Sequence, residues 1–161
     1  MPKETIPFSA FLEAAGPLHT EFINQLHEYL LSHGCTTEIK LAANGYVVSY
    51  LHKPTKRTVI NYVFRKKGPL LRVYADNIAA YEEILTDWPK SMKDTVKKAG
   101  PCKRLLDPTD CNSRCPMGYV FDMNGKEYKN CRYGSFMFEM KDENHMAVCD
   151  FLHRELTERL A

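Results

Sequence analysis

Four of the six cysteines fall within one short part of the sequence, at Cys102, Cys111, Cys115 and Cys131. Thiolates are soft ligands that suit tetrahedral Zn²⁺, and a closed structural site needs four donors brought together. The spacing is C-x8-C-x3-C-x15-C, in which only Cys111 and Cys115 have the separation typical of a zinc knuckle. These residues predict a structural zinc site, with zinc as the cofactor.

The same cysteines allow two other interpretations. Cys102 and Cys131 can be small hydrophobic residues at the ends of elements, with Cys111 and Cys115 as free loop thiols. A loop cysteine can also be the nucleophile of a small enzyme, because its histidine partner need only be near in space. The sequence has no H-E-x-x-H, no G-x-S-x-G and no glycine-rich phosphate loop. The catalytic residues of such an enzyme are therefore unknown.

Positive charge gathers in two parts of the chain, from residue 53 to 67 and from 90 to 104. Lys53, Arg57 and Lys66 are the residues that we expect to hold an anionic ligand. The tyrosines of nearby strands can stack on an aromatic ligand. Lysines at sheet edges also protect against aggregation. The pI of about 8.2 is below the value typical of a nucleic-acid footprint, so nucleic acid is not the favoured partner.

Two motifs resemble those of a group of small bacterial proteins. Residues 111–119 read CNSRCPMGY, Cys131-Arg132-Tyr133 follows, and residues 53–58 read KPTKRT. The resemblance covers about residues 50–140, with KPxKRT and CNxxCPxGY as the shared patterns. This group is uncharacterised. The resemblance therefore implies a bacterial, cytosolic protein and transfers no activity.

The elements that must position these cysteines and basic residues can be predicted from the spacing of apolar residues, which is helical in some segments and strand-like in others. Apolar residues at i, i+3 and i+4 predict two helices within 8–32, interrupted at Gly16-Pro17. A period of two with β-branched and aromatic residues then predicts an antiparallel meander. Its strands are expected at 37–41, 46–51, 58–64 and 70–74.

The second half of the chain predicts two helices, a cysteine-rich loop and a hairpin. The helices begin at Asp76 or Asn77 and at Pro89, and the loop covers 101–116. Strands at 119–123 and 127–131 are joined by Asn124-Gly125, which favours a type I′ turn. A strand at 136–140 and a helix at 144–160 follow. The apolar stripe of this last helix is expected at Met146, Cys149, Leu152, Leu156 and Leu160.

These patterns together predict an α+β fold with N-terminal helices, an antiparallel β-meander, two helices, a Cys-rich loop with a β-hairpin, and a C-terminal helix. The chain has 161 residues, 44% hydrophobic and 26% charged, which suits a single domain over 1–161. No apolar run reaches the roughly 20 residues of a membrane helix. The polar N-terminus does not have the continuous apolar core of a secretory signal, so we do not expect export. We therefore expect a cytoplasmic binding module that does not interact with membranes, with a small cysteine enzyme as the alternative.

Overall fold

The computed structural model describes residues 6–66, 68–99, 101–107, 109–110, 118–130 and 135–160. The predicted α+β class and the predicted order of elements are confirmed. The chain divides into two compact units, one made of residues 1–73 and 139–145 and the other of 74–138 and 146–161. Among the described residues, none of the helices has the length and apolar character that a membrane crossing requires.

The first unit begins with helices that are interrupted where the sequence indicates. Helix α1 (Phe8–Ala15) ends at Gly16, whose φ of 95° lies in the region that glycine adopts without strain. Pro17 opens the short η1 (Pro17–His19), since its missing N–H is not needed in a first turn. Helix α2 (Thr20–Ser32) follows.

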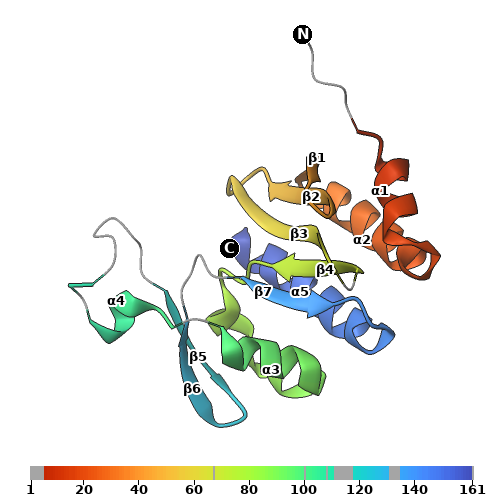
Figure 1. Ribbon diagram of the computed structural model, residues 1–161. Helices are drawn as coiled ribbons and strands as arrows, with labels where there is room; N and C mark the ends of the chain where they lie inside the picture. The colour runs from red at the N-terminus through yellow and green to blue at the C-terminus, as the bar shows by residue number, and fades with distance from the viewer. Residues whose placement is uncertain are drawn as a thin grey trace. The chain divides into compact units, whose positions relative to one another are not determined.

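The meander of the first unit has β1 (Cys35–Ala42), β2 (Gly45–His52), β3 (Arg57–Arg65) and β4 (Gly68–Val73) (Figure 1). Each of these strands pairs antiparallel with the next. The strand order of the whole sheet is β1-β2-β3-β4-β7, with β7 at Phe136–Glu139. β1 is therefore an edge strand, and β3 lies in the interior of the sheet.

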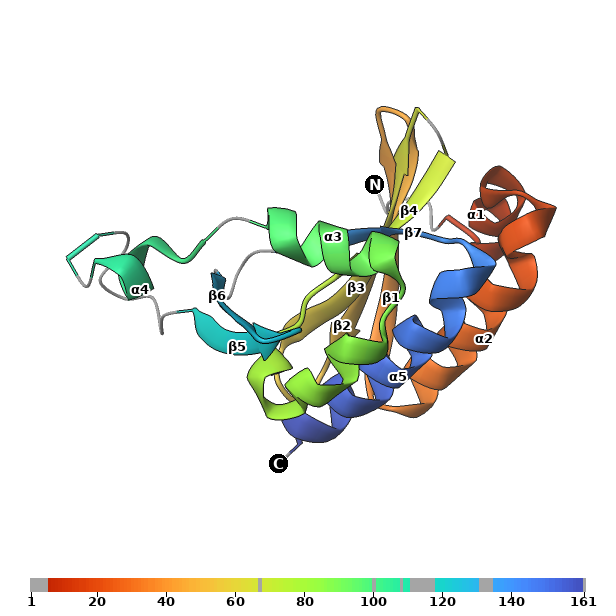
Figure 2. The same cartoon turned by 90° about the horizontal axis from the view of Figure 1, so that it is seen from below.

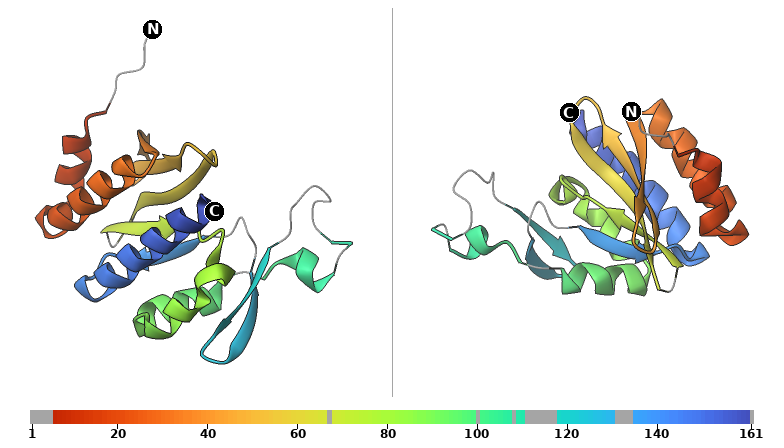
Figure 3. Two further views of the ribbon diagram at one scale, coloured as in Figure 1. Left: turned by 180° about the vertical axis from the view of Figure 1, so that it is seen from behind. Right: turned by 45° about the horizontal axis from the view of Figure 1, so that its top comes forward.

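Helices α1 and α2 lie on one face of this meander (Figure 3). Phe11 of α1 is fully buried, with its ring centroid 5.1 Å from Tyr62 and 6.1 Å from Phe64 of β3. Burying such aromatic side chains contributes a large share of the stability of a small core. The other face of the same strands has Val47 and Val63, and it also has polar residues described below.

The second unit contains η2 (Ile78–Asp87), α3 (Lys90–Lys98), the short α4 (Lys103–Leu106), the hairpin of β5 (Tyr119–Met123) and β6 (Lys126–Asn130), and most of α5 (Asp142–Arg159). η2 runs beside α5 (Figure 2). The turn between β5 and β6 has Asn124 at φ 52° and Gly125 at φ 81°, as a type I′ turn requires.

Three local predictions need correction. The helix expected after Asn77 is a 3₁₀ segment with a non-helical residue at Tyr81, and α4 lies inside the segment predicted as a loop. The stripe predicted for the C-terminal helix is rotated, because Met146 and Leu160 are 79% and 67% exposed. Phe151 is fully buried instead. Leu152 and Leu156 belong to both stripes, so spacing alone did not select the correct side.

Candidate functional sites

Cys102 is the only predicted zinc ligand within the described residues. Its side chain is buried and its Sγ accepts a hydrogen bond from the Gly118 backbone N–H at 3.3 Å. Its own N–H donates to the Lys129 carbonyl at 2.8 Å. Cys111, Cys115 and Cys131 lie outside the described residues. Within the part of the chain that the structure describes, no group of three or more His, Cys, Asp or Glu side chains is arranged to hold a metal.

The backbone approaches Cys102 closely at Gly118. A Cβ at position 118 would lie 2.0 Å from the Asn130 carbonyl oxygen and 2.7 Å from the Cys102 Cβ. Only glycine fits there, because a side chain would collide with backbone. The cysteine is thus held at the base of the β5–β6 hairpin, beside the residue that precedes Cys131 in the sequence.

The predicted anion-binding residues are divided between the two ends of β3. Lys53 and Arg57 flank the β2–β3 turn, whereas Lys66 follows the last residue of β3. Arg57 and Lys66 are nine positions apart in sequence, which is about 30 Å along an extended strand. A small anion cannot contact both ends of β3. A long polyanion can.

The first unit has a row of polar residues on the sheet face opposite α1 and α2. Strand register pairs Glu38 with Ser49, Ser49 with Asn61, and Asn61 with Arg72. Directly paired residues project to the same face of a sheet, so these four side chains form one line across β1, β2, β3 and β4. We call Glu38, Ser49, Asn61 and Arg72 the polar row.

Asn61 interrupts a run of buried apolar residues in β3 and is only 7% exposed. Its Nδ2 donates to the Ser49 Oγ at 2.6 Å. Its Oδ1 has no hydrogen-bond partner among the described residues, a situation that costs about 1–3 kcal/mol. Because the Ser49 oxygen accepts from Asn61, its own hydroxyl proton remains available for another acceptor.

Arg72 lies at the end of the polar row and is half-buried. Within the described residues its guanidinium forms no ion pair, whereas Glu38 at the other end is paired with Lys40 at 3.4 Å. A guanidinium that lacks a carboxylate partner is suited to bind a carboxylate or phosphate through two parallel hydrogen bonds. The row therefore offers a cation and a hydroxyl donor on either side of Asn61.

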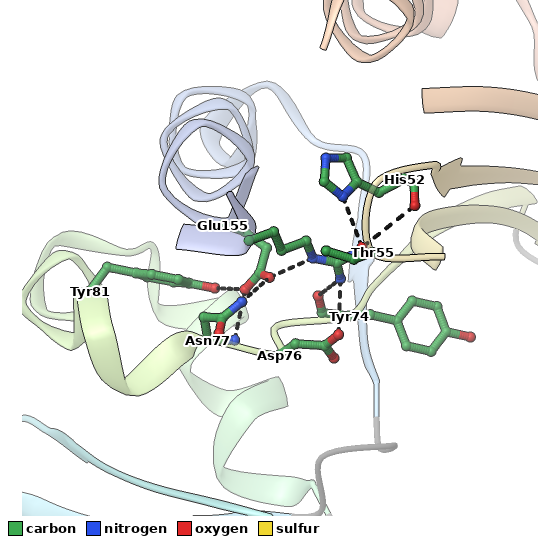
Figure 4. Close-up of polar contacts among 8 residues, drawn as sticks. His52, Thr55, Tyr74, Asp76, Asn77, Tyr81 and Glu155 are labelled. Atoms are coloured by element: carbon green, nitrogen blue, oxygen red, sulfur yellow. Dashed lines mark hydrogen bonds and ion pairs between the residues drawn. The ribbon is translucent and has the colours of Figure 1, made fainter. Parts of the chain in front are cut away.

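The second unit contains a cluster of buried polar groups that we call the buried ion network (Figure 4). Its centre is the Glu155 carboxylate on α5, which is fully buried. Oε1 accepts from the Asn77 N–H at 2.9 Å and from the Tyr81 hydroxyl at 2.6 Å. Oε2 accepts from the Asn77 Nδ2 at 2.9 Å and from the Arg159 Nε at 2.7 Å.

Arg159 extends the buried ion network toward the segment that precedes η2. Its Nη2 donates to the Tyr74 carbonyl at 3.2 Å and to Asp76 Oδ2 at 3.3 Å, and its side chain is 2% exposed. A carboxylate has about four acceptor positions, and those of Glu155 are filled. This network fixes η2 against α5, and its carboxylate has no capacity left for a ligand.

His27 and His52 are among the histidines of the first unit that make polar contacts. His27 Nδ1 lies 2.8 Å from the Tyr50 hydroxyl, and its ring stacks on Phe8 at 4.0 Å. Burial lowers the pKa of His27, against the opposing effect of Glu28, and burial raises the pKa of Tyr50. His52, whose Nδ1 lies 2.8 Å from the Thr55 Oγ1, is fully buried beside the β2–β3 turn (Figure 4). For His27, burial therefore favours the neutral ring.

Comparison of the chain with protein-family models, with curated proteins and with solved structures found no match. The candidate sites must therefore be judged on their geometry.

Sequence reasoning did not identify the polar row or the buried ion network. The signal for the row was present, since Ser49 and Asn61 each interrupt an apolar strand. The signal for the network was Glu155 between Leu152 and Leu156 on the apolar side of α5, four residues before Arg159. Each signal consists of polar residues at positions where periodicity expects apolar ones.

Proposed function

We propose that the protein is a non-catalytic, cytosolic bacterial binding module whose sheet face in the first unit holds a small anionic ligand, a carboxylate or a phosphate. The observation that carries the proposal is the alignment of Ser49, Asn61 and Arg72 in one register, with Asn61 donating to Ser49. Polar residues in three successive strands are costly in a sheet interior, so a role in recognition explains them better than packing does.

The spacing of the strands suits a ligand of a few atoms. Neighbouring strands are about 4.8 Å apart, so Ser49 and Arg72 lie roughly 10 Å apart at the level of the backbone. The long Arg72 side chain can cross part of that distance above Asn61. An anion bound there would accept hydrogen bonds from the guanidinium and from the Ser49 hydroxyl, while Asn61 holds the hydroxyl in position.

Titration of the protein with inorganic phosphate and with acetate at low salt tests this proposal. Arg72→Gln removes the charge-assisted hydrogen bonds, which are worth about 1.5–3 kcal/mol, and should weaken binding roughly 10- to 150-fold. Ser49→Ala should weaken it less. Arg65→Gln is the matched control, since Arg65 is an exposed arginine at the end of β3. Equal effects of Arg65→Gln and Arg72→Gln would refute the proposal, as would an absence of saturable binding of both anions.

Lys53 and Arg57 form a second anion-binding candidate at the opposite end of β3 from Lys66. Lys53 and Lys56 are exposed and Arg57 is half-buried. A polyanion that bound along this edge would be held by long-range attraction, with an affinity that falls steeply as salt rises. A small anion at the polar row would depend far less on salt, so the salt dependence distinguishes the two sites.

We also propose that Cys102, Cys111, Cys115 and Cys131 bind one structural Zn²⁺. The position of Cys102 supports this proposal, because its buried sulfur lies at the base of the hairpin that leads to Cys131. Three further thiolates would complete a closed tetrahedral site.

Metal analysis of protein purified without chelator tests the zinc proposal. About one zinc per chain is expected, and Cys115→Ser should reduce the metal content. Cys149→Ser is the control, since Cys149 is a half-buried thiol on α5 whose pKa is raised by burial and by Asp150. Absence of zinc together with a single thiol that reacts much faster than the rest would instead favour the cysteine enzyme.

A further inference from the structure

The outer edge of the sheet in the first unit is a regular strand with no described strand beyond it. β1 pairs with β2 over its full length, from Cys35 opposite His52 to Ala42 opposite Gly45, with no shift in register. It contains no proline and no bulge, which are common devices that prevent edge strands from pairing. Leu41 near its end is 76% exposed. An edge of this kind is a template for another strand.

The hairpin geometry determines which backbone groups of β1 face outward. The two-residue turn at 43–44 closes on a hydrogen-bonded pair, Ala42 with Gly45. Hydrogen-bonded pairs alternate along an antiparallel ladder, so Glu38 and Lys40 direct their N–H and C=O groups toward β2. The Lys53 N–H donates to the Gly34 carbonyl at 2.9 Å, which agrees with this alternation. The backbone groups of Thr37, Ile39 and Leu41 therefore point away from the sheet.

Charge selects one register for a second copy of this strand. In an antiparallel pair of two β1 strands, the residues whose backbone groups face outward hydrogen-bond to each other. If a hydrogen-bonded pair lies on the two-fold axis, that residue pairs with its own copy, and it is Thr37, Ile39 or Leu41. Centring on Ile39 places Glu38 of each copy opposite Lys40 of the other. If the axis instead passed through Glu38 or Lys40, in a non-hydrogen-bonded pair, that residue would lie opposite its own copy. Two like charges would then face each other, which is destabilising.

We propose that two copies of this chain associate through β1, antiparallel and centred on Ile39, so that the sheets of their first units join. The interface is isologous, as a closed dimer requires. Thr37, Ile39 and Leu41 of the two copies exchange about six backbone hydrogen bonds. Glu38 and Lys40, whose side chains are 67% and 68% exposed, supply two opposite-charge pairs across the axis. Leu41 is partly covered by the partner strand.

Sedimentation equilibrium of the full chain and two charge variants tests the proposal. Glu38→Lys places lysines opposite lysines, and Lys40→Glu places glutamates opposite glutamates, so each variant alone should dimerise about tenfold more weakly than the wild type. An equimolar mixture of the two should associate at least as well as the wild type, because each lysine then opposes a glutamate. The double variant with both changes in one chain should also recover dimerisation.

The matched controls are Glu13→Lys and Lys97→Glu, which make the same charge changes at exposed positions of α1 and α3. They should leave the dimerisation constant unchanged. A wild-type chain that stays monomeric at millimolar concentration overturns the proposal. The proposal is also overturned if neither single substitution changes the dimerisation constant, or if the mixture of the two variants associates no better than each variant alone. Circular dichroism shows whether each variant is folded, and the double variant keeps the test decisive if one single variant is not.

Discussion

Arg159→Leu should destabilise the fold far more than Arg154→Leu, although both arginines lie on α5. Arg159 is 2% exposed and contacts the carboxylates of Glu155 and Asp76 at 2.7 Å and 3.3 Å. Removing it leaves two buried carboxylates without their cation, which costs about 3–5 kcal/mol. Arg154 is 34% exposed and pairs with Glu83, which is 62% exposed. Such a surface pair contributes little to stability, because water screens it.

Urea and thermal unfolding followed by circular dichroism measure the difference. For a chain of this size, 1 kcal/mol corresponds to about 2–4 °C in Tm. Arg159→Leu should therefore lower Tm by roughly 6–20 °C, and Arg154→Leu by less than about 4 °C. If Arg159→Leu does not fold, Tyr81→Phe removes one hydrogen bond to the same carboxylate and should cost about 1.5–3 kcal/mol. Equal effects of the two arginine variants would refute the view that burial makes this network important.

Four further outcomes are expected. Burial lowers the pKa of His27. The stability that the neutral ring contributes is therefore present above its unfolded pKa of about 6.5 and is lost as pH falls through the folded pKa. His27→Gln should reduce the loss of unfolding free energy between about pH 7 and 5, and an unchanged pH profile would contradict this. Gly125→Ala should cost about 1 kcal/mol in urea unfolding, because φ is 81° and no atom lies near the added methyl group. Phe11→Ala should cost about 3–5 kcal/mol in the same assay, since Phe11 is fully buried. Arg57→Glu should weaken binding of polyphosphate at low salt, with Glu158→Gln at a half-buried position of α5 as the control. Identical binding by both variants would rule out Lys53 and Arg57 as a polyanion-binding site.

Much of the fold follows from the sequence, because most elements have one strong periodicity. The meander was predicted from alternating β-branched and aromatic residues, and Asn124-Gly125 predicted the type I′ turn that the dihedral angles confirm. The 3₁₀ form of η2 was not predictable. Tyr81 leaves the helical region within η2 and donates to Glu155, a residue 74 positions away in sequence, and local propensity contains no information on that contact.

The sites were predicted less well, since they depend on register and burial. No local pattern aligns Ser49, Asn61 and Arg72, because the alignment requires the pairing of three strands. Sequence reasoning assigned no role to Glu155, whose side chain is fully buried at the centre of the network. The zinc site stays a prediction, because three of its four cysteines lie outside the described residues. Sequence reasoning placed Lys53, Arg57 and Lys66 in one anion-binding site. In the structure the length of β3 separates Lys66 from Lys53 and Arg57.

The division of the chain also determines when each unit can be completed during synthesis. The first unit includes residues 139–145, so it lacks part of its residues until after 74–138 of the second unit have been translated. The first unit therefore cannot be completed before the residues of the second unit begin to be translated, unlike a chain whose N-terminal unit is continuous in sequence. The strands of the meander pair with their neighbours in sequence, whereas residues 139–145 join the unit across a long sequence separation, and contacts of that kind slow folding.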